Sequence, residues 1–148
     1  METLTGWRVS EVTDGHARWE LYQAALASDT ARPALLAAIT REPDGALASG
    51  VVGAVLERVP RAERGAWVEA LAPAARAFCA RRADELEVLE HLRAGSLAPE
   101  PDPALVEGWS DWLQLRIAAE VSDPAVLRAL AEAGRTKRIR RAAAEALG

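Results

Sequence analysis

DPAVLRALAEAGRTKRIRRAAAEALG, residues 123–148, is the stretch that most clearly predicts the fold. Asp123 can accept hydrogen bonds from the free amides of a helix start, and Pro124 loses no hydrogen bond at the first helical position. Gly134 ends this helix, and Thr136 can cap a second helix that runs to the end of the stretch. Because the connection between the two is short, we expect them to pack antiparallel.

The remainder of the chain carries the same kinds of helix signal. Alanine is abundant, and with Leu, Arg and Glu it favours helix over strand. Caps and breaks predict further helices that begin at Asp14, after Ser28-Asp29-Thr30, at Asp44, before Trp67, at Pro73, at Asp102-Pro103 and at Ser110 or Asp111. The fifth of these, from Pro73, should run to about Arg93 and end at Gly95. The sequence therefore predicts an all-α fold.

The apolar residues of these helices recur at helical spacing and predict the core. The residues expected to be buried on the capped helices are Leu35, Leu36, Ile39, Val55, Leu127, Leu130 and Ile139. The face of the long fifth helix should include Phe78, Cys79, Leu86, Leu89 and Leu92. Gly50 and Gly53 weaken the third helix and are interpreted as places where a neighbour packs closely.

Two segments differ from this helical pattern. Residues 1–13 are interpreted as an extended N-terminal arm, in which Trp7 and Val9 alternate with polar neighbours. Residues 14–148 are predicted to form a single helical domain. Within it, residues 95–103 hold three prolines and little to bury, so this stretch is predicted to link two sub-bundles.

Composition limits the class of protein. A chain of 148 residues can bury a core without disulfides, and Cys79 is its single cysteine. No apolar run approaches the length of a membrane helix, and the first residues lack a secretory signal, so a cytoplasmic protein is expected. Arginine outnumbers lysine 17 to 1, which favours a high-GC bacterial genome.

No motif predicts catalysis or a cofactor. None of the six serines lies in a nucleophile elbow, and no phosphate loop or dinucleotide fingerprint is present. Glu87 and His91 have a spacing that can serve a metal, but we interpret them as part of a solvated acidic helix face. We therefore predict no catalytic residue, metal or cofactor. An enzyme that uses carboxylates without a recognisable motif is left open.

A basic cluster near the end of the chain is the main candidate site. Residues 135–141 hold five basic residues and no acidic one, whereas the remainder holds 13 basic and 22 acidic residues. On a helix with Ile139 turned inward, Lys137, Arg138 and Arg141 share the outer side, and Arg135 lies just before them. These four residues are predicted to bind an acidic protein surface or a nucleic acid. Trp7 and Trp109 are candidate hot-spot aromatics, although at least three of the five tryptophans should be core.

The chain also resembles a known class of repeat protein. Ile139–Gly148 looks like the first helix of a bacterial HEAT-like repeat, and Leu115–Ala119 resembles the same start 24 residues earlier, a spacing similar to that of variant leucine-rich repeats. A weak internal repeat relates Trp19, Ser28-Asp29 and Pro33 to Trp112, Ser122-Asp123 and Pro124. The resemblance implies stacked antiparallel helical hairpins that form a fragment of a right-handed α-α superhelix.

Such proteins mostly hold proteins or nucleic acids on an extended surface. The resemblance thus implies a non-catalytic protein-interaction or scaffold module, with a nucleic-acid-binding repeat protein as the alternative. An acidic chain argues against the nucleic-acid alternative, because phosphate binding usually needs a wider basic footprint. The partner is expected to be another protein and not a membrane. The oligomeric state is left open.

Overall fold

A computed structural model of the chain describes residues 3–4, 7–8, 14–95 and 102–148. The chain divides into two compact units, Met1–Ala83 and Asp84–Gly148, and the division falls inside helix α5, Arg76–Arg93. It does not fall at 95–103, the stretch interpreted from the sequence as a linker. Residues 96–101 of that stretch lie outside the described residues.

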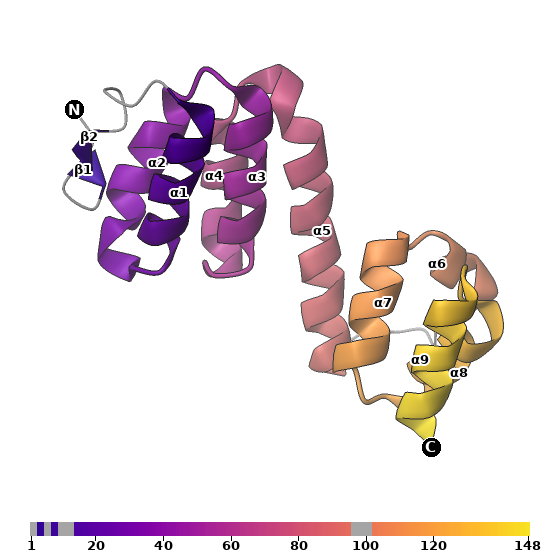
Figure 1. Ribbon diagram of the computed structural model, residues 1–148. Coiled ribbons are helices and arrows are strands. Elements are labelled where there is room, and N and C mark those ends of the chain that lie inside the picture. Colours follow the sequence, from indigo (N-terminus) through magenta and orange to yellow (C-terminus); the bar gives the residue numbers. More distant parts are fainter. Residues whose placement is uncertain (1–2, 5–6, 9–13, 96–101) are drawn as a thin grey trace. The chain divides into compact units, whose positions relative to one another are not determined.

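The first unit is a layered group of helices (Figure 1). Its helices are α1 (Gly15–Leu26), α2 (Arg32–Thr40), α3 (Gly45–Leu56) and α4 (Arg64–Ala70), followed by the start of α5. Helix α1 packs against α2 and α3, and α4 packs against the same two helices. Short 3₁₀ turns at Asp29–Ala31, Arg61–Glu63 and Pro73–Ala75 lead into α2, α4 and α5.

Within the predicted N-terminal arm, two very short strands pair. Strands β1 (Thr3–Leu4) and β2 (Trp7–Arg8) are antiparallel, with Thr3 opposite Arg8. The other regular elements of the described residues are helices, so the all-α fold class is confirmed.

Capping side chains start these helices where the sequence predicts. Asp14 accepts from the amide of His16 at 3.2 Å, and Asp44 accepts from the amides of Ala46 and Leu47 at 3.1 Å. These bonds satisfy amides that have no partner within the helix. Gly50 lies against Trp19, because a Cβ added there would be 3.3 Å from the indole ring. Close packing therefore explains this glycine, as predicted.

The core of the first unit is formed by the inward faces of α1 to α5. Of its predicted members, Leu35, Ile39 and Val55 are buried, and Leu36 is only half-buried. Phe78 was expected on the buried face of α5, and this expectation is wrong because its side chain is 55 % exposed. One residue is about 100° of helix turn, so Phe78 lies beside the stripe that begins at the fully buried Cys79.

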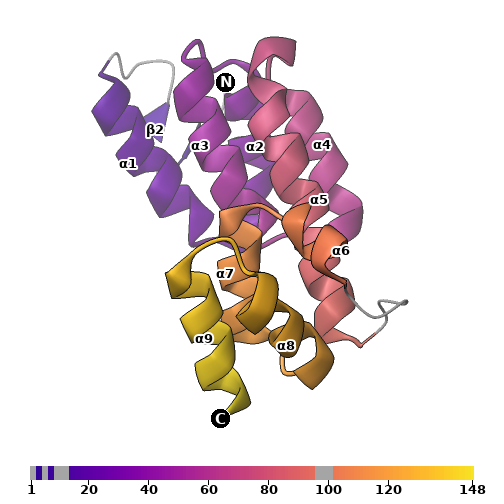
Figure 2. The ribbon, with the colours of Figure 1, turned by 90° about the vertical axis from the view of Figure 1, so that its right-hand side faces the viewer.

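Among its described residues, the second unit contains the end of α5 and four further helices, which can be followed in Figure 2. These are α6 (Pro103–Glu107), α7 (Asp111–Glu120), α8 (Pro124–Ala133) and α9 (Lys137–Leu147). Helix α9 packs against both α8 and α7, and α6 packs against α8. Four of these helices begin with a capping side chain that accepts a hydrogen bond from a backbone amide of the first turn: Asp102, Ser110, Asp123 and Thr136.

The second unit has a continuous core. The predicted residues Leu127, Leu130 and Ile139 belong to it, together with Leu89, Leu92, Val106, Trp109, Leu113, Ile117, Ala118, Val121, Val126 and Ala143. No helix among the described residues has both the length and the apolar character that crossing a bilayer requires.

Candidate interaction face on α9

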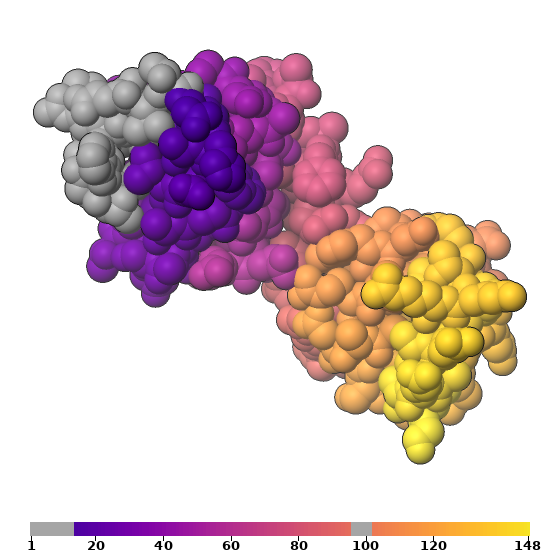
Figure 3. Space-filling view, viewed as in Figure 1, coloured from indigo at the N-terminus to yellow at the C-terminus, as the bar shows by residue number. Residues whose placement is uncertain are grey.

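Helix α9 has one buried side and one exposed side. Thr136 caps it by accepting from the amide of Ile139 at 3.1 Å. Ile139 and Ala143 are fully buried, and their side chains hold the helix against α8 and α7. Lys137, Arg138, Arg141 and residues 144–147 are exposed, whereas Arg140 and Ala142 are half-buried. In the space-filling view α9, in yellow, lies at the surface of its unit (Figure 3).

Three of the predicted site residues come together on the exposed side. Lys137, Arg138 and Arg141 are exposed and, with Ala142 and Glu145, line a shallow recess of about 300 Å³. We call this the cationic recess. None of the three basic side chains forms an ion pair or a hydrogen bond within the part of the chain that the structure describes. Their charges are thus available to a ligand.

Arg135, the fourth predicted site residue, has a different place. Its guanidinium forms an ion pair with Asp111 and donates to the carbonyls of Glu107 and Trp109 at 2.7 and 2.9 Å. Its backbone amide donates to Gln114 Oε1 at 3.0 Å. Arg135 does not line the cationic recess. It connects the α8–α9 turn to the start of α7.

Arg140 is also held within the fold. Its Nη1 donates to the carbonyl of Gly134 at 2.7 Å, so its charge lies at the end of α8. A helix C-terminus carries partial negative charge, and a cation there is stabilising. Of the four basic residues on α9, three line the recess, and the fourth, Arg140, binds a backbone carbonyl at the end of α8.

The cationic recess contrasts with the rest of its unit. Helix α9 holds four basic residues and one acidic residue, whereas residues 84–136 hold four basic and eleven acidic residues. Several of those four are already paired: Arg93 and Arg116 both form ion pairs with Glu120. A local positive potential on an acidic unit attracts and orients an anionic ligand.

None of the tryptophans whose side chains the structure describes is exposed. Trp109 was a candidate hot-spot aromatic, but it is only 6 % exposed and lies in the core of the second unit, where a partner cannot reach it. Trp67 is also buried, and Trp19 and Trp112 are half-buried. The side chain of Trp7, the other candidate, lies outside the described residues.

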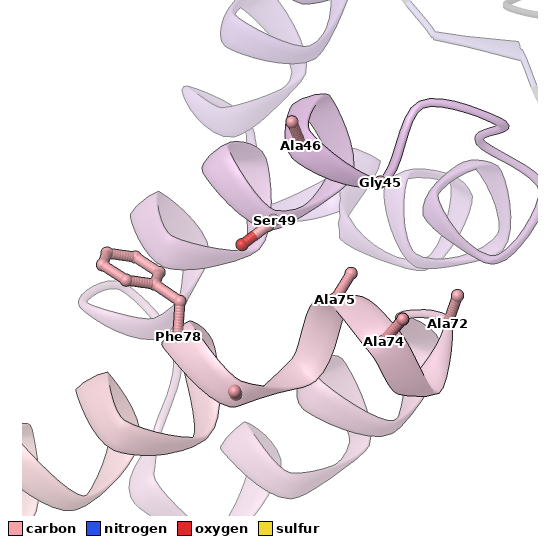
Figure 4. Close-up of a pocket in the computed structure, with 8 residues that line it drawn as sticks. Gly45, Ala46, Ser49, Ala72, Ala74, Ala75 and Phe78 are labelled. Carbon is pink, nitrogen blue, oxygen red and sulfur yellow. The ribbon is translucent and has the colours of Figure 1, made fainter.

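The first unit contains an apolar recess that the sequence analysis missed. It measures about 550 Å³ and is lined by Gly45, Ala46, Ser49, Ala72, Ala74, Ala75, Ala77 and Phe78 (Figure 4). Seven of these side chains are small, and the exposed Phe78 lies at one end beneath the guanidinium of Arg82. The alanine-rich run after the break at Leu71 was the available signal, but only the fold brings it to α3.

Cys79 lies beside this recess without opening into it. Its thiol is fully buried and lies 3.3 Å from the carbonyl oxygen of Ser49, to which it donates. Burial raises the pKa of the Cys79 thiol, because the thiolate would lose its hydration. A buried thiol with a raised pKa is a poor nucleophile, so the structure gives Cys79 a packing role.

Among the described residues, no group of three or more His, Cys, Asp and Glu side chains lies close enough to share a metal ion. No protein-family model, curated protein or solved structure matches the chain at a significant level. The class of protein therefore rests on the fold and the site. Together they define a helical domain with one exposed, unpaired cationic recess among its described residues.

Proposed function

We propose that the chain is a non-catalytic protein-interaction module of the HEAT-like helical-hairpin type, and that it binds an acidic protein partner through the cationic recess. The observation that carries this proposal is the set of three exposed cations, Lys137, Arg138 and Arg141, which have no partner among the described residues. The other arginines of α9 and of the turn before it are held by carbonyls or carboxylates.

The spacing on α9 supports a single binding site. Lys137 and Arg141 are four residues apart and Arg138 and Arg141 three apart, so all three charges lie on neighbouring turns of one helix face. Three like charges held together repel one another, and an anionic ligand relieves that repulsion. Carboxylates on a partner surface would form charge-assisted hydrogen bonds with both guanidinium groups.

The hairpin arrangement of the proposal rests on pairs of matching helices. Helices α1 and α7 each carry a half-buried tryptophan, and each is followed by a helix with proline in its first turn, α2 and α8. Neighbouring hairpins of this kind bury a shared core and leave their outer helices free to bind. We place this module in the cytoplasm, where a lone free cysteine such as Cys79 is common.

A triple variant tests the proposal: Lys137→Gln, Arg138→Gln and Arg141→Gln. Arg135 is left unchanged because it holds the fold together. Partners crosslinked to the wild-type chain in its native cell should be lost from the triple variant, while the helical circular dichroism signal stays the same. Arg128→Gln is the matched control, since Arg128 is exposed in the same unit outside the recess. Retention of every partner by the triple variant would contradict the proposal.

A nucleic acid is the second candidate ligand, because the same three cations suit phosphates. Binding through three phosphate contacts would weaken with salt at a slope of about −3 on logarithmic axes. The footprint is narrow, however, and the surrounding unit is acidic. Fluorescence anisotropy with a duplex DNA separates the two candidates: a steep salt dependence that disappears in the triple variant would favour the nucleic acid.

A further inference from the structure

The cationic recess contains one acidic side chain, so its charge is positive at one end and negative at the other. Glu145 is exposed and lies four residues after Arg141 and seven after Arg138 on the same helix. Although Arg141 is within the distance of a helical i, i+4 pair, Glu145 forms no ion pair among the described residues. Along α9 the exposed charges therefore run positive, positive, positive, negative.

We infer that the partner presents a segment with two or three carboxylates and a basic residue at one end of them, with the basic residue opposite Glu145. This inference rests on the proposed function and names the charge pattern that the recess selects. The carboxylates would pair with Lys137, Arg138 and Arg141. A segment that is acidic along its whole length would place a carboxylate against Glu145, and such like-charge contacts oppose binding.

The helix geometry sets the spacing of this pattern. An α-helix rises 1.5 Å per residue, so Lys137 and Arg141 are about 6 Å apart along the axis, and Glu145 is about 6 Å further. An extended segment covers about 6–7 Å in two residues. The basic residue of the partner should thus lie about two residues from the nearest carboxylate in an extended segment, or about one turn from it in a helix.

Ala142 provides room for this contact. It lines the recess between the long side chains and is half-buried, so its methyl group can contact an apolar partner residue between the charged ones. A phosphodiester backbone lacks both features of the inferred segment. It is anionic throughout, so it would bring a negative charge against Glu145 within the recess.

The inference is tested by NMR titration of the isotope-labelled full chain with two synthetic peptides of identical composition and blocked ends. The first places Lys at one end of two Glu residues, and the second places Lys between them. The first should bind about 1.5 to 5 times more tightly, the range given by one exposed ion pair, and should shift the amide resonances of α9. Glu145→Gln should remove this preference, and the control Glu132→Gln should keep it, because Glu132 is exposed in the same unit but outside the recess.

Three results would overturn these conclusions, and they differ from one another. Equal binding of the two peptides by the wild type, with both lost in the triple variant, overturns the inferred charge pattern and leaves the proposed function. Absence of binding by either peptide, or unchanged binding by the triple variant, overturns the proposed function as well. Tighter binding to a duplex DNA than to either peptide replaces the protein partner with a nucleic acid.

Discussion

The basic side chains of residues 135–141 have different roles because they contact different neighbours. Arg135 reaches two carbonyl oxygens and a carboxylate, and Arg140 reaches the carbonyl of Gly134. Lys137, Arg138 and Arg141 reach none of these among the described residues. Residue type alone does not separate the two groups, so charge counts identify the segment but not the side chains that can bind.

Gln114 is a buried polar residue that links several parts of the second unit. Its Nε2 donates to the carbonyls of Val106 and Trp109 at 2.8 and 3.0 Å, and its Oε1 accepts from the amide of Arg135. Its side chain is fully buried. It therefore connects three segments that are separate in the sequence, and it fixes the turn from which α9 begins.

Gln114→Leu should lower the free energy of unfolding by about 2 kcal/mol or more. The substitution roughly keeps the side-chain volume but removes three hydrogen bonds, each of which contributes about 0.5–1.5 kcal/mol. The amide of Arg135 is left without its acceptor, whereas the carbonyls of Val106 and Trp109 each keep one donor, Trp109 N and Arg135 Nη2. Urea unfolding measures the loss. Gln23→Leu is the matched control, because Gln23 is exposed on α1, and it should change stability by less than about 0.5 kcal/mol. Equal effects of the two substitutions would show that the hydrogen bonds of Gln114 do not stabilise the unit.

At the level of the helices, the α8–α9 connection depends on a glycine. A Cβ on Gly134 would lie 2.5 Å from the carbonyl oxygen of Leu130 and 2.8 Å from Cγ2 of Ile139. The backbone at Gly134 has an ordinary negative φ. Glycine is thus needed for space and not for a left-handed conformation, and that space lets α9 turn back against α8.

Gly134→Ala should destabilise the chain by about 1–3 kcal/mol, because the added methyl group forces α9 away from α8. Gly65→Ala is a matched control in α4, where nothing lies within 4 Å of an added Cβ. That substitution should leave stability unchanged or raise it by up to about 1 kcal/mol, since alanine favours helix. Thermal unfolding of both variants provides the measurement, and a Gly134→Ala protein as stable as wild type would refute the close approach.

For the chain as a whole, the main feature is the division into two compact units with separate buried clusters. The core of the second unit is built from residues 89–143, and the first unit buries its own set from Tyr22 to Cys79. A domain of this size usually unfolds cooperatively, but clusters that share few residues can open separately.

Leu127→Ala should cost about 2–5 kcal/mol, because Leu127 is 3 % exposed in the second core. Compared with the wild type, hydrogen exchange measured by mass spectrometry should be accelerated more in α6 to α9 than in α1 to α4. Leu35→Ala, at a fully buried position of the first unit, should give the reverse pattern. Uniform acceleration along the chain in both variants would show that the two units unfold as one.

Local signals in the sequence were enough to locate the helices. A cap such as Asp44, Ser110 or Thr136 accepts hydrogen bonds from amides only two or three residues ahead, so its effect can be predicted without knowledge of the fold. The same is true of the apolar stripes on the capped helices, where six of the seven residues predicted to be buried are buried. Helical spacing alone places these residues on one side of their helix.

Contacts between distant residues decided the rest. The burial of Trp109, the exposure of Phe78 and the apolar recess between α3 and the start of α5 depend on which helices pack together. The candidate site shows the same division. The basic cluster was visible in the sequence, but Arg135 was removed from it by Glu107, Trp109 and Asp111, which lie 24 to 28 residues earlier in the chain. Packing brings such partners together, and a sequence pattern that extends over one or two helical turns cannot predict them.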